Sequence, residues 1–345
     1  MLYPRRPSRG LPASCKDLCP RARFAHPTCS ERQSAHRRPC YHHGERGSRE
    51  RREGAHMFKL AAFTDEISQD LERACTVLNE FDAAGVEIRG VWDIPCHKLT
   101  DAQVEEIKRI VENHGLEVAS IGSPFGKCEL EDAAAVAEHM EILRRCADIG
   151  HALGCTLVRG FAFWGHGVRQ KPWDRMLDAY EPVPAVLEEK QVILGLENEA
   201  ACLVGTAGHT RTFLDLLECD RVKALWDPAN HVQDPDSDDE PVFPNGYEAL
   251  RKDLVHVHAK DAVVGADGRR PNVFLGEGIC RWREQLQALK DSDYKGHVSL
   301  ETHVDPERFP ESLRDTYGHY LSGEGREGAS KVCLAWLRDA MAALS

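Results

Sequence analysis

Hydrophobic positions along the chain follow two alternating periods from residue 59 onward. Short, mostly apolar runs typical of buried strands alternate with longer runs whose apolar residues recur every three or four positions, as in amphipathic helices. Helical spacing is seen, for example, at Leu71, Ala74, Leu78 and Phe81, at Ile279, Trp282, Leu286 and Leu289, and near residues 330–344. The expected strands cover residues 59–64, 85–90, 117–122, 156–161, 192–198, 223–227, 254–260 and 297–302.

This alternation predicts an α/β fold, a single-domain (β/α)8 TIM barrel over residues 57–345. A doubly wound sheet also alternates, but it usually carries a glycine-rich phosphate-binding turn after its first strand. Here Thr64, Asp65 and Glu66 follow the first strand, and none of them is glycine. The barrel also explains why polar residues gather at the carboxyl ends of the strands, where the active sites of this fold lie.

Residues 1–56 differ from the rest of the chain in composition. They carry 13 Lys and Arg against 5 Asp and Glu and show almost no apolar periodicity. We therefore expect a disordered basic leader, and Met57 stands where a folded domain would begin if the leader were an artefact of start-site choice. Four cysteines in the leader invite a zinc module, but their spacing matches no regular finger. A transit peptide is disfavoured by the Glu residues and the missing amphipathic repeat.

The remaining body is strongly acidic. Residues 57–345 carry 31 Lys and Arg against 51 Asp and Glu, a net charge of −20. Such a body repels phosphate backbones and anionic membranes, so we expect a small carbohydrate-like molecule as partner, no nucleic acid and no membrane. No stretch reaches the roughly 18 to 20 apolar residues of a membrane span. The nine cysteines of this body have no paired spacings, which predicts reduced thiols and a cytoplasmic protein. A homo-oligomer is a possible assembly.

Four of the expected strands end in a residue that can bind a divalent metal: Glu197, Asp227, His258 and Glu301. In a parallel barrel the carboxyl ends of all strands meet at one mouth, so we expect these four side chains to converge there. Three carboxylates and an imidazole make a mixed oxygen and nitrogen site for one divalent metal ion, Mn, Mg, Co or Zn. Without a cation, the three carboxylates would repel one another.

Further polar residues near the strand ends are candidates for substrate binding. Side-chain alternation places three of them on the same face as the metal-binding residues, and the others lie on or after the fourth and sixth strands. A solvated rim, a salt bridge inside the barrel or loop packing are the alternative roles. The candidates are Glu199, Lys260, Asn230, His303, Arg159 and Trp164. His256 lies one strand step below His258 and is expected to support it or to belong to the core.

These motifs resemble the xylose-isomerase-like TIM barrels, a family of sugar-phosphate isomerases and epimerases that also includes dehydratases and endonuclease IV. The resemblance covers residues 57–345 and rests on the segments GLENE, WDPAN, HVHAKD, LGEG and SLETH. It implies that the metal ligands of the family fall on Glu197, Asp227, His258 and Glu301. Strand geometry points to the same four residues.

The resemblance also implies a reaction, that of a divalent-metal-dependent isomerase or epimerase of a small sugar, keto-polyol or hydroxy-keto acid. Glu197 and Glu301 would be the catalytic residues, on opposite faces of the substrate. One would remove a proton alpha to a carbonyl, giving a metal-stabilised enediolate, and the other would return a proton. A dehydratase acting on a keto-inositol would use the same enolate and expel a hydroxyl, so the motifs do not separate the two reactions.

Two further classes are less compatible with the sequence. A nuclease like endonuclease IV would need a basic face and additional histidines on earlier strands, which here end in Arg89, Gly122 and Arg159. A non-catalytic sugar-binding barrel is disfavoured by the complete set of four ligands. Several epimerases of the family carry a substrate-facing histidine near the place where this chain has Asn230.

Overall fold

The computed structural model describes residues 58–168, 170–323 and 325–344. The leader expected at residues 1–56 lies outside this part of the chain. In the described part, eight parallel strands close into a barrel in the order β1-β12-β9-β8-β7-β6-β5-β2. The (β/α)8 prediction is confirmed, since every expected strand is present. The strands are β1 (Lys59–Phe63), β2 (Gly85–Ile88), β5 (Glu117–Ile121), β6 (Leu157–Gly160), β7 (Ile193–Glu197), β8 (Val222–Trp226), β9 (Leu254–Ala259) and β12 (His297–Leu300).

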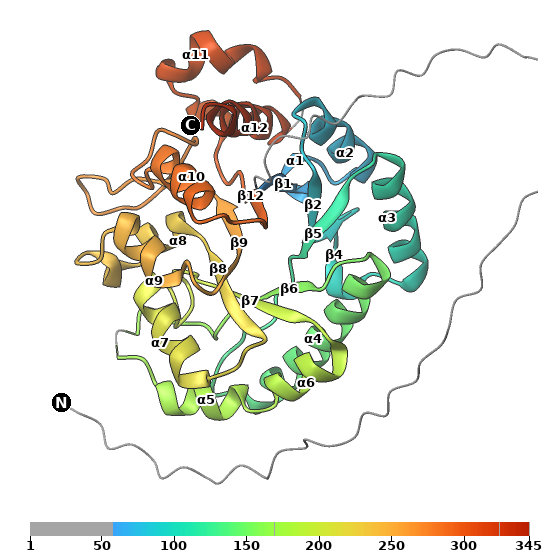
Figure 1. Cartoon of the computed structure of the whole chain (residues 1–345), viewed down its shortest axis with the longest axis vertical. Helices are drawn as coiled ribbons and strands as arrows, with labels where there is room; N and C mark the ends of the chain where they lie inside the picture. Colours follow the sequence, from blue (N-terminus) through green and yellow to red (C-terminus); the bar gives the residue numbers. More distant parts are fainter. Residues whose placement is uncertain (1–57, 169, 324, 345) are drawn as a thin grey trace, which may run out of the picture. The chain divides into compact units, whose positions relative to one another are not determined.

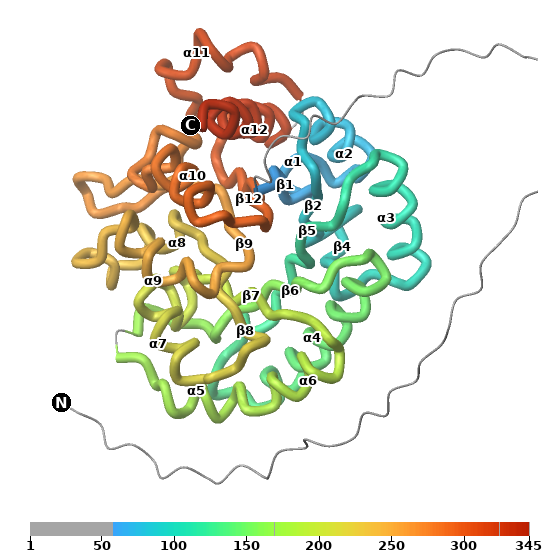
Figure 2. The backbone as a smooth tube through the Cα atoms, viewed as in Figure 1, coloured from blue at the N-terminus to red at the C-terminus, as the bar shows by residue number. Residues whose placement is uncertain are grey.

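Helices surround the barrel in an outer ring, and the chain passes around this ring from the blue strand β1 to the red helix α12 (Figures 1 and 2). None of the helices in the described residues is both long and apolar enough to cross a bilayer. The helices are α1 (Thr64–Ile67), α2 (Leu71–Glu80), α3 (Asp101–Asn113), α4 (Ala133–Ala152), α5 (Trp173–Tyr180), α6 (Val183–Lys190), α7 (Ala207–Leu217), α8 (Pro228–Gln233), α9 (Tyr247–Leu250), α10 (Trp282–Asp291), α11 (Glu311–Tyr317) and α12 (Glu327–Ala342).

Several helices begin at a side-chain cap that the sequence contains. Asp70 accepts hydrogen bonds from the first backbone N–H groups of α2, and Asp132 does the same for α4. Thr100 and Gln103 form a reciprocal capping box at the start of α3. One predicted helix starts too early. The spacing placed Ile279 on the apolar face of this helix, but Ile279 precedes α10 and is 46% exposed. The loop at this position is held instead by Asp261, which accepts from the backbone N–H groups of Gly278 and Cys280.

Two short hairpins extend the loops at the carboxyl ends of the strands, and the sequence pattern did not indicate either of them. One pairs β3 (Gly90–Val91) with β4 (Ile94–Pro95) after β2. The other pairs β10 (Asp261–Ala262) with β11 (Asn272–Val273) after β9. Two-residue strands carry too little periodicity to be recognised in a sequence.

Much of the barrel interior is polar, although the Phe63 ring also lies there, beside His258 and Arg159. Along β2, β6, β9 and β12, fully buried apolar residues pack outward under the helices and alternate with buried polar residues. Because successive side chains face opposite sides of a strand, these polar residues face the barrel axis. They include Glu87, Arg159, His256, His258 and Ser299. A buried charge is costly unless it is paired, so this interior has to be held together by ion pairs and hydrogen bonds.

Candidate metal centre and active site

The four predicted ligands meet at the carboxyl ends of their strands. One donor atom from each of Glu197, Asp227, His258 and Glu301 lies within 4.8 Å of the others. All four residues are buried, with at most 4% of their surface exposed. Glu197 ends β7, His258 lies on β9, and the other two directly follow β8 and β12. The structure therefore brings these four residues together, and their role as ligands stays a prediction.

Asp227 is oriented by the helix that follows it. It is the N-cap of α8, and its Oδ1 accepts a hydrogen bond from the backbone N–H of Asn230 at 2.9 Å. Pro228 takes the first helical position, where no backbone donor is required. Capping thus occupies Oδ1 and leaves Oδ2 for the ligand cluster.

Asn198, which sequence reasoning did not single out, connects the ends of β7 and β8. Its Oδ1 accepts from the backbone N–H of Asp227 at 2.8 Å, and its Nδ2 donates to the backbone oxygen of Asp227 at 2.7 Å. Two reciprocal bonds to one residue hold Glu197 and Asp227 in register at the mouth. The signal that the sequence offered for Asn198 was its position as a polar residue directly after the glutamate that ends a strand.

Lys260 carries its ammonium group into the ligand cluster. Its Nζ lies 2.9 Å from Oδ2 of Asp227 and 2.8 Å from Oε2 of Glu301. The side chain is 4% exposed, and the backbone oxygen of Lys260 accepts a hydrogen bond from Nε1 of Trp282 at 2.9 Å. Lys260 was predicted to contact substrate, and in this structure it is the counter-ion of two predicted ligands.

Arg89 is a second cation at the mouth and was not among the residues that the sequence predicted for the site. Its Nη1 donates to Oε1 of Glu301 at 3.0 Å, and its Nε donates to Oδ2 of Asp65 at 2.8 Å. Its Nη2 donates to Oε1 of Glu66 at 2.5 Å. Charged residues at the ends of the first two strands were the signal for this group, but strand periodicity alone does not show that they reach Glu301.

Three other predicted substrate-binding residues contact the carboxylates of Glu197 and Glu301. Nη1 of Arg159 lies 3.4 Å from Oε2 of Glu197, and Nδ2 of Asn230 donates to Oε1 of the same residue at 3.1 Å. Nε2 of His303 lies 3.4 Å from Oε1 of Glu301 and 3.0 Å from Oε1 of Glu66. His303 also has a positive φ of 41°, a backbone conformation that is costly for a residue with a side chain.

Glu199 and Trp164 lie farther out, on the rim of the mouth. Oε2 of Glu199 accepts from Nζ of Lys127 at 2.8 Å. The same ammonium group lies 4.1 Å from the ring centroid of Phe161 and 5.6 Å from that of Trp164. The Phe161 ring is fully buried, so the rim offers a charged pair and the partly exposed ring of Trp164 to one face of a sugar.

Charges inside the cluster shift the pKa of every predicted ligand. Burial, together with the charges of Glu301 and Glu197, raises the pKa of Asp227 to about 6. Burial also acts against the charged form of His258, but the carboxylates of Glu87 and Glu197 outweigh it and raise its pKa to about 10.

The two glutamates shift in the opposite direction. Burial favours their neutral forms, but nearby cations dominate. The pKa of Glu197 is lowered by the charges of His258 and Arg159, and the pKa of Glu301 is held well below its usual range by Lys260 and His303. Both glutamates are therefore carboxylates at neutral pH.

The cluster fits a divalent cation. Oε2 of Glu197 is buried without a hydrogen bond, and Oδ2 of Asp227 has none of good geometry despite the nearby ammonium of Lys260. Two buried carboxylate oxygens that lack a hydrogen bond, in a set of three carboxylates and an imidazole, match the donors that Mn, Mg, Co or Zn accept.

Comparison with known proteins identifies the family. The model of the xylose isomerase-like TIM barrel family matches residues 75–338. The chain belongs to this family. The resemblance drawn from the strand-end motifs is thereby confirmed. No curated protein matches this xylose isomerase-like chain.

Solved structures of the xylose isomerase-like fold superpose on the chain at low sequence identity. A family protein from Mycobacterium smegmatis in complex with magnesium is 15% identical, with a TM-score of 0.60 over 84% of this chain and 99% of that one. L-ribulose 3-epimerase is 20% identical, with a TM-score of 0.60 over 83% and 95% of the two chains. D-allulose 3-epimerase from Methylomonas sp., in complex with D-allulose, is 18% identical, with a TM-score of 0.58 over 81% and 95%. At these identities the likeness shows the shared fold.

Proposed function

We propose that this protein is a divalent-metal-dependent isomerase or epimerase of a small sugar, keto-polyol or hydroxy-keto acid. The observation that carries the proposal is the convergence of Glu197 and Glu301 with Asp227 and His258, buried at the carboxyl mouth of the barrel. The epimerases among the similar structures, one of them bound to D-allulose, support a sugar substrate. The magnesium complex of a similar barrel supports a divalent metal.

Glu197 and Glu301 are the residues suited to proton transfer. Both are carboxylates at neutral pH, because nearby cations lower their pKa. One would remove a proton from the carbon next to the substrate carbonyl, and the other would return a proton to a new position or face. A divalent cation held by the four ligands would supply Lewis acidity toward the carbonyl oxygen.

The remaining polar groups would orient the substrate and stabilise charge. Lys260 and Arg159 are buried cations beside Glu301 and Glu197, and either could stabilise negative charge that develops on a substrate oxygen. Burial excludes water and strengthens these interactions. Glu199 and Trp164 would contact the outer part of the substrate at the rim.

The proposal is tested by hydrogen exchange with solvent. The protein is stripped of metal with a chelator, reloaded with Mn, Mg, Co or Zn, and incubated in deuterium oxide with a panel of keto sugars, inososes and hydroxy-keto acids. Proton NMR is expected to show metal-dependent deuterium incorporation at the alpha carbon together with a rearranged product, and Glu301→Gln should lose both. A dehydrated product would assign the lyase reaction instead. Absence of exchange with every substrate in the panel, in protein that has bound metal, would contradict the proposal.

A further inference from the structure

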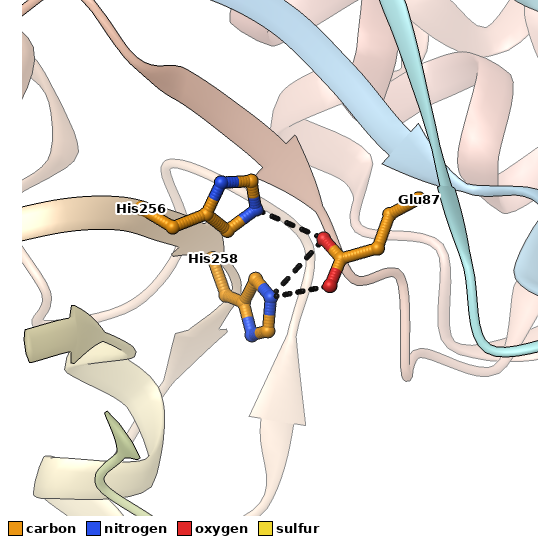
Figure 3. Close-up of side chains that lie close together, drawn as sticks. All are labelled: Glu87, His256 and His258. Atoms are coloured by element: carbon orange, nitrogen blue, oxygen red, sulfur yellow. Dashed lines mark hydrogen bonds and ion pairs between the residues drawn. The ribbon is translucent and has the colours of Figure 1, made fainter. Parts of the chain in front are cut away.

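A second polar cluster lies in the barrel interior beside the four-residue site. It consists of Glu87 on β2 with His256 and His258 on β9, and all three side chains are fully buried. Figure 3 shows both imidazole rings pointing toward the Glu87 carboxylate. In the strand order, β1 and β12 separate β2 from β9, so Glu87 reaches these rings across the barrel interior.

The contacts within this cluster are at hydrogen-bond distance. Nε2 of His256 lies 2.9 Å from Oε2 of Glu87. Nε2 of His258 lies 3.3 Å from Oε1 and 3.2 Å from Oε2 of the same carboxylate. A carboxylate only accepts hydrogen bonds, so both Nε2 atoms must carry protons to bond with it.

His258 belongs to both clusters through its two ring nitrogens. While Nε2 faces Glu87, Nδ1 lies 3.1 Å from Oε1 of Glu197, inside the four-residue site. By the same rule Nδ1 also carries a proton in the metal-free protein, and a cation bound at Nδ1 would release this proton to solvent. The ring edge also packs against Phe63, with a distance of 5.0 Å between the ring centroids. A neutral histidine binds a metal through the nitrogen that carries no proton, and the hydrogen bond of the other nitrogen decides which one that is.

We propose that Glu87 is a positioning residue that retains the proton on Nε2 of His258 and thereby presents Nδ1 to the cation of the proposed metal site. His256 holds Glu87 in place by donating to Oε2. The inference rests on the proposed metal dependence and assigns a task to a carboxylate that would not itself touch metal or substrate. A carboxylate in this position behind a metal-binding histidine typically changes metal affinity by about 10- to 100-fold.

A second cation between Glu87, His256 and His258 is the competing explanation. When the first site is filled through Nδ1, such a cation would have to bind Nε2 of the same ring and displace its proton. The two explanations therefore predict different metal stoichiometries. Our proposal requires one bound cation per chain, and the alternative requires two.

The test compares the wild type, Glu87→Gln and Ser120→Ala. Gln keeps the size of the side chain but can place an N–H donor against Nε2, which favours the proton on Nδ1. Ser120 is the control because it lies beside Glu87 in the strand register, is fully buried, and its Oγ makes no hydrogen bond in the described residues. Zinc affinity and stoichiometry are measured by titration calorimetry and elemental analysis, without substrate.

We expect one zinc per chain, affinity lowered about 10- to 100-fold in Glu87→Gln, and affinity unchanged in Ser120→Ala. Long-range proton–nitrogen NMR of 15N-histidine-labelled, zinc-loaded protein reports which nitrogen carries the proton, and His258→Gln assigns the signals. The wild type should show His258 protonated at Nε2.

Several results would overturn the inference. They are a His258 protonated at Nδ1 in the zinc-loaded wild type, unchanged affinity in Glu87→Gln, two zinc ions per chain, or no zinc at all. If Glu87→Gln does not fold, the wild-type NMR result alone decides. Because no readout uses substrate, failure of the inference is distinguishable from failure of the proposed reaction, which is judged by exchange in metal-loaded protein.

Discussion

Nζ of Lys260 lies 2.9 Å from Oδ2 of Asp227, so a permanent cation already stands among the predicted metal ligands. Its second contact, 2.8 Å to Oε2 of Glu301, makes it the counter-ion of two buried carboxylates. Burial acts against the charge of Lys260, but Asp227 and Glu301 outweigh it and raise the pKa well above the ordinary value. Lys260 thus allows the metal-free barrel to fold around three converging carboxylates. A bound divalent cation would share with Lys260 the neutralisation of their negative charge.

Replacing this lysine should make the fold depend on metal. In Lys260→Met, Asp227 and Glu301 lose their buried partner, and we expect the metal-free protein to lose about 3 to 5 kcal/mol of unfolding free energy. Urea unfolding with and without manganese measures the effect, and added metal should recover more stability in the variant than in the wild type. Lys223→Met is the control, since its pair with Asp253 is partly exposed and should contribute about 1 kcal/mol or less. Equal metal dependence in Lys260→Met and the wild type would contradict the counter-ion role.

Asp227 should destabilise the metal-free protein at neutral pH. Its pKa in the folded protein is about 6, above the ordinary value of 3.8, because of burial and the charges of Glu301 and Glu197. Because the pKa of Asp227 is raised on folding, the stability that its protonated form contributes is fully present below the unfolded pKa of 3.8. This contribution is lost as pH rises through 6, the pKa in the folded protein. Asp227→Asn should therefore stabilise the metal-free protein at pH 7.5 by about 1 to 3 kcal/mol, with the gain shrinking as pH falls toward 4.

The same substitution should abolish tight metal binding, which separates the ligand role of Asp227 from its effect on the fold. Chemical unfolding of metal-free protein between pH 4 and pH 8 and a metal titration measure the two effects. Asp253→Asn serves as a control of opposite sign, because hydrogen bonds from Lys223 and Arg211 lower the pKa of Asp253. It should lower stability at neutral pH. A destabilised Asp227→Asn protein at pH 7.5 would contradict the prediction.

The two glutamates should act as a pair in proton transfer. Glu197→Gln and Glu301→Gln each keep the side-chain volume but remove a proton acceptor, and we expect kcat to fall by about 10²- to 10⁴-fold. Single-turnover deuterium exchange at saturating metal is the measurement, so that weaker metal binding does not account for the loss. Asn230→Ala, which removes a hydrogen bond to Glu197, should have a smaller effect. Wild-type exchange rates in either Gln variant would refute the assignment.

Trp164 should act on substrate binding more than on chemistry. Its partly exposed ring lies near Lys127, the partner of Glu199, and makes no contact with the four predicted ligands in the described residues. Trp164→Ala should raise KM about 10-fold and change kcat by about threefold or less, because stacking on the outer part of a sugar contributes equally before and during the reaction. Val168→Ala, a change at an exposed position on the same loop, is the control. An unchanged KM would place the substrate elsewhere on the mouth.

The hydrophobic pattern by itself determined the architecture. The periods of strands and helices are local properties of the chain. Eight repeats of a strand followed by a helix leave few arrangements besides a closed parallel barrel. The convergence of Glu197, Asp227, His258 and Glu301 followed from this, because a residue at the end of a parallel strand has only one mouth to face. The loop before α10 did not follow, since the helical spacing of Ile279 gave no sign that Asp261 holds the backbone there.

Only the tertiary structure decided which charges meet. Side-chain alternation places Glu87 and His258 in the barrel interior. Whether their side chains touch depends on the order of the strands and on the stagger between them. The reach of Arg89 to Glu301 and the two partners of Lys260 have the same origin. Periodicity describes the direction in which a side chain points, whereas the distance between two side chains is set by the closed barrel that brings their strands together.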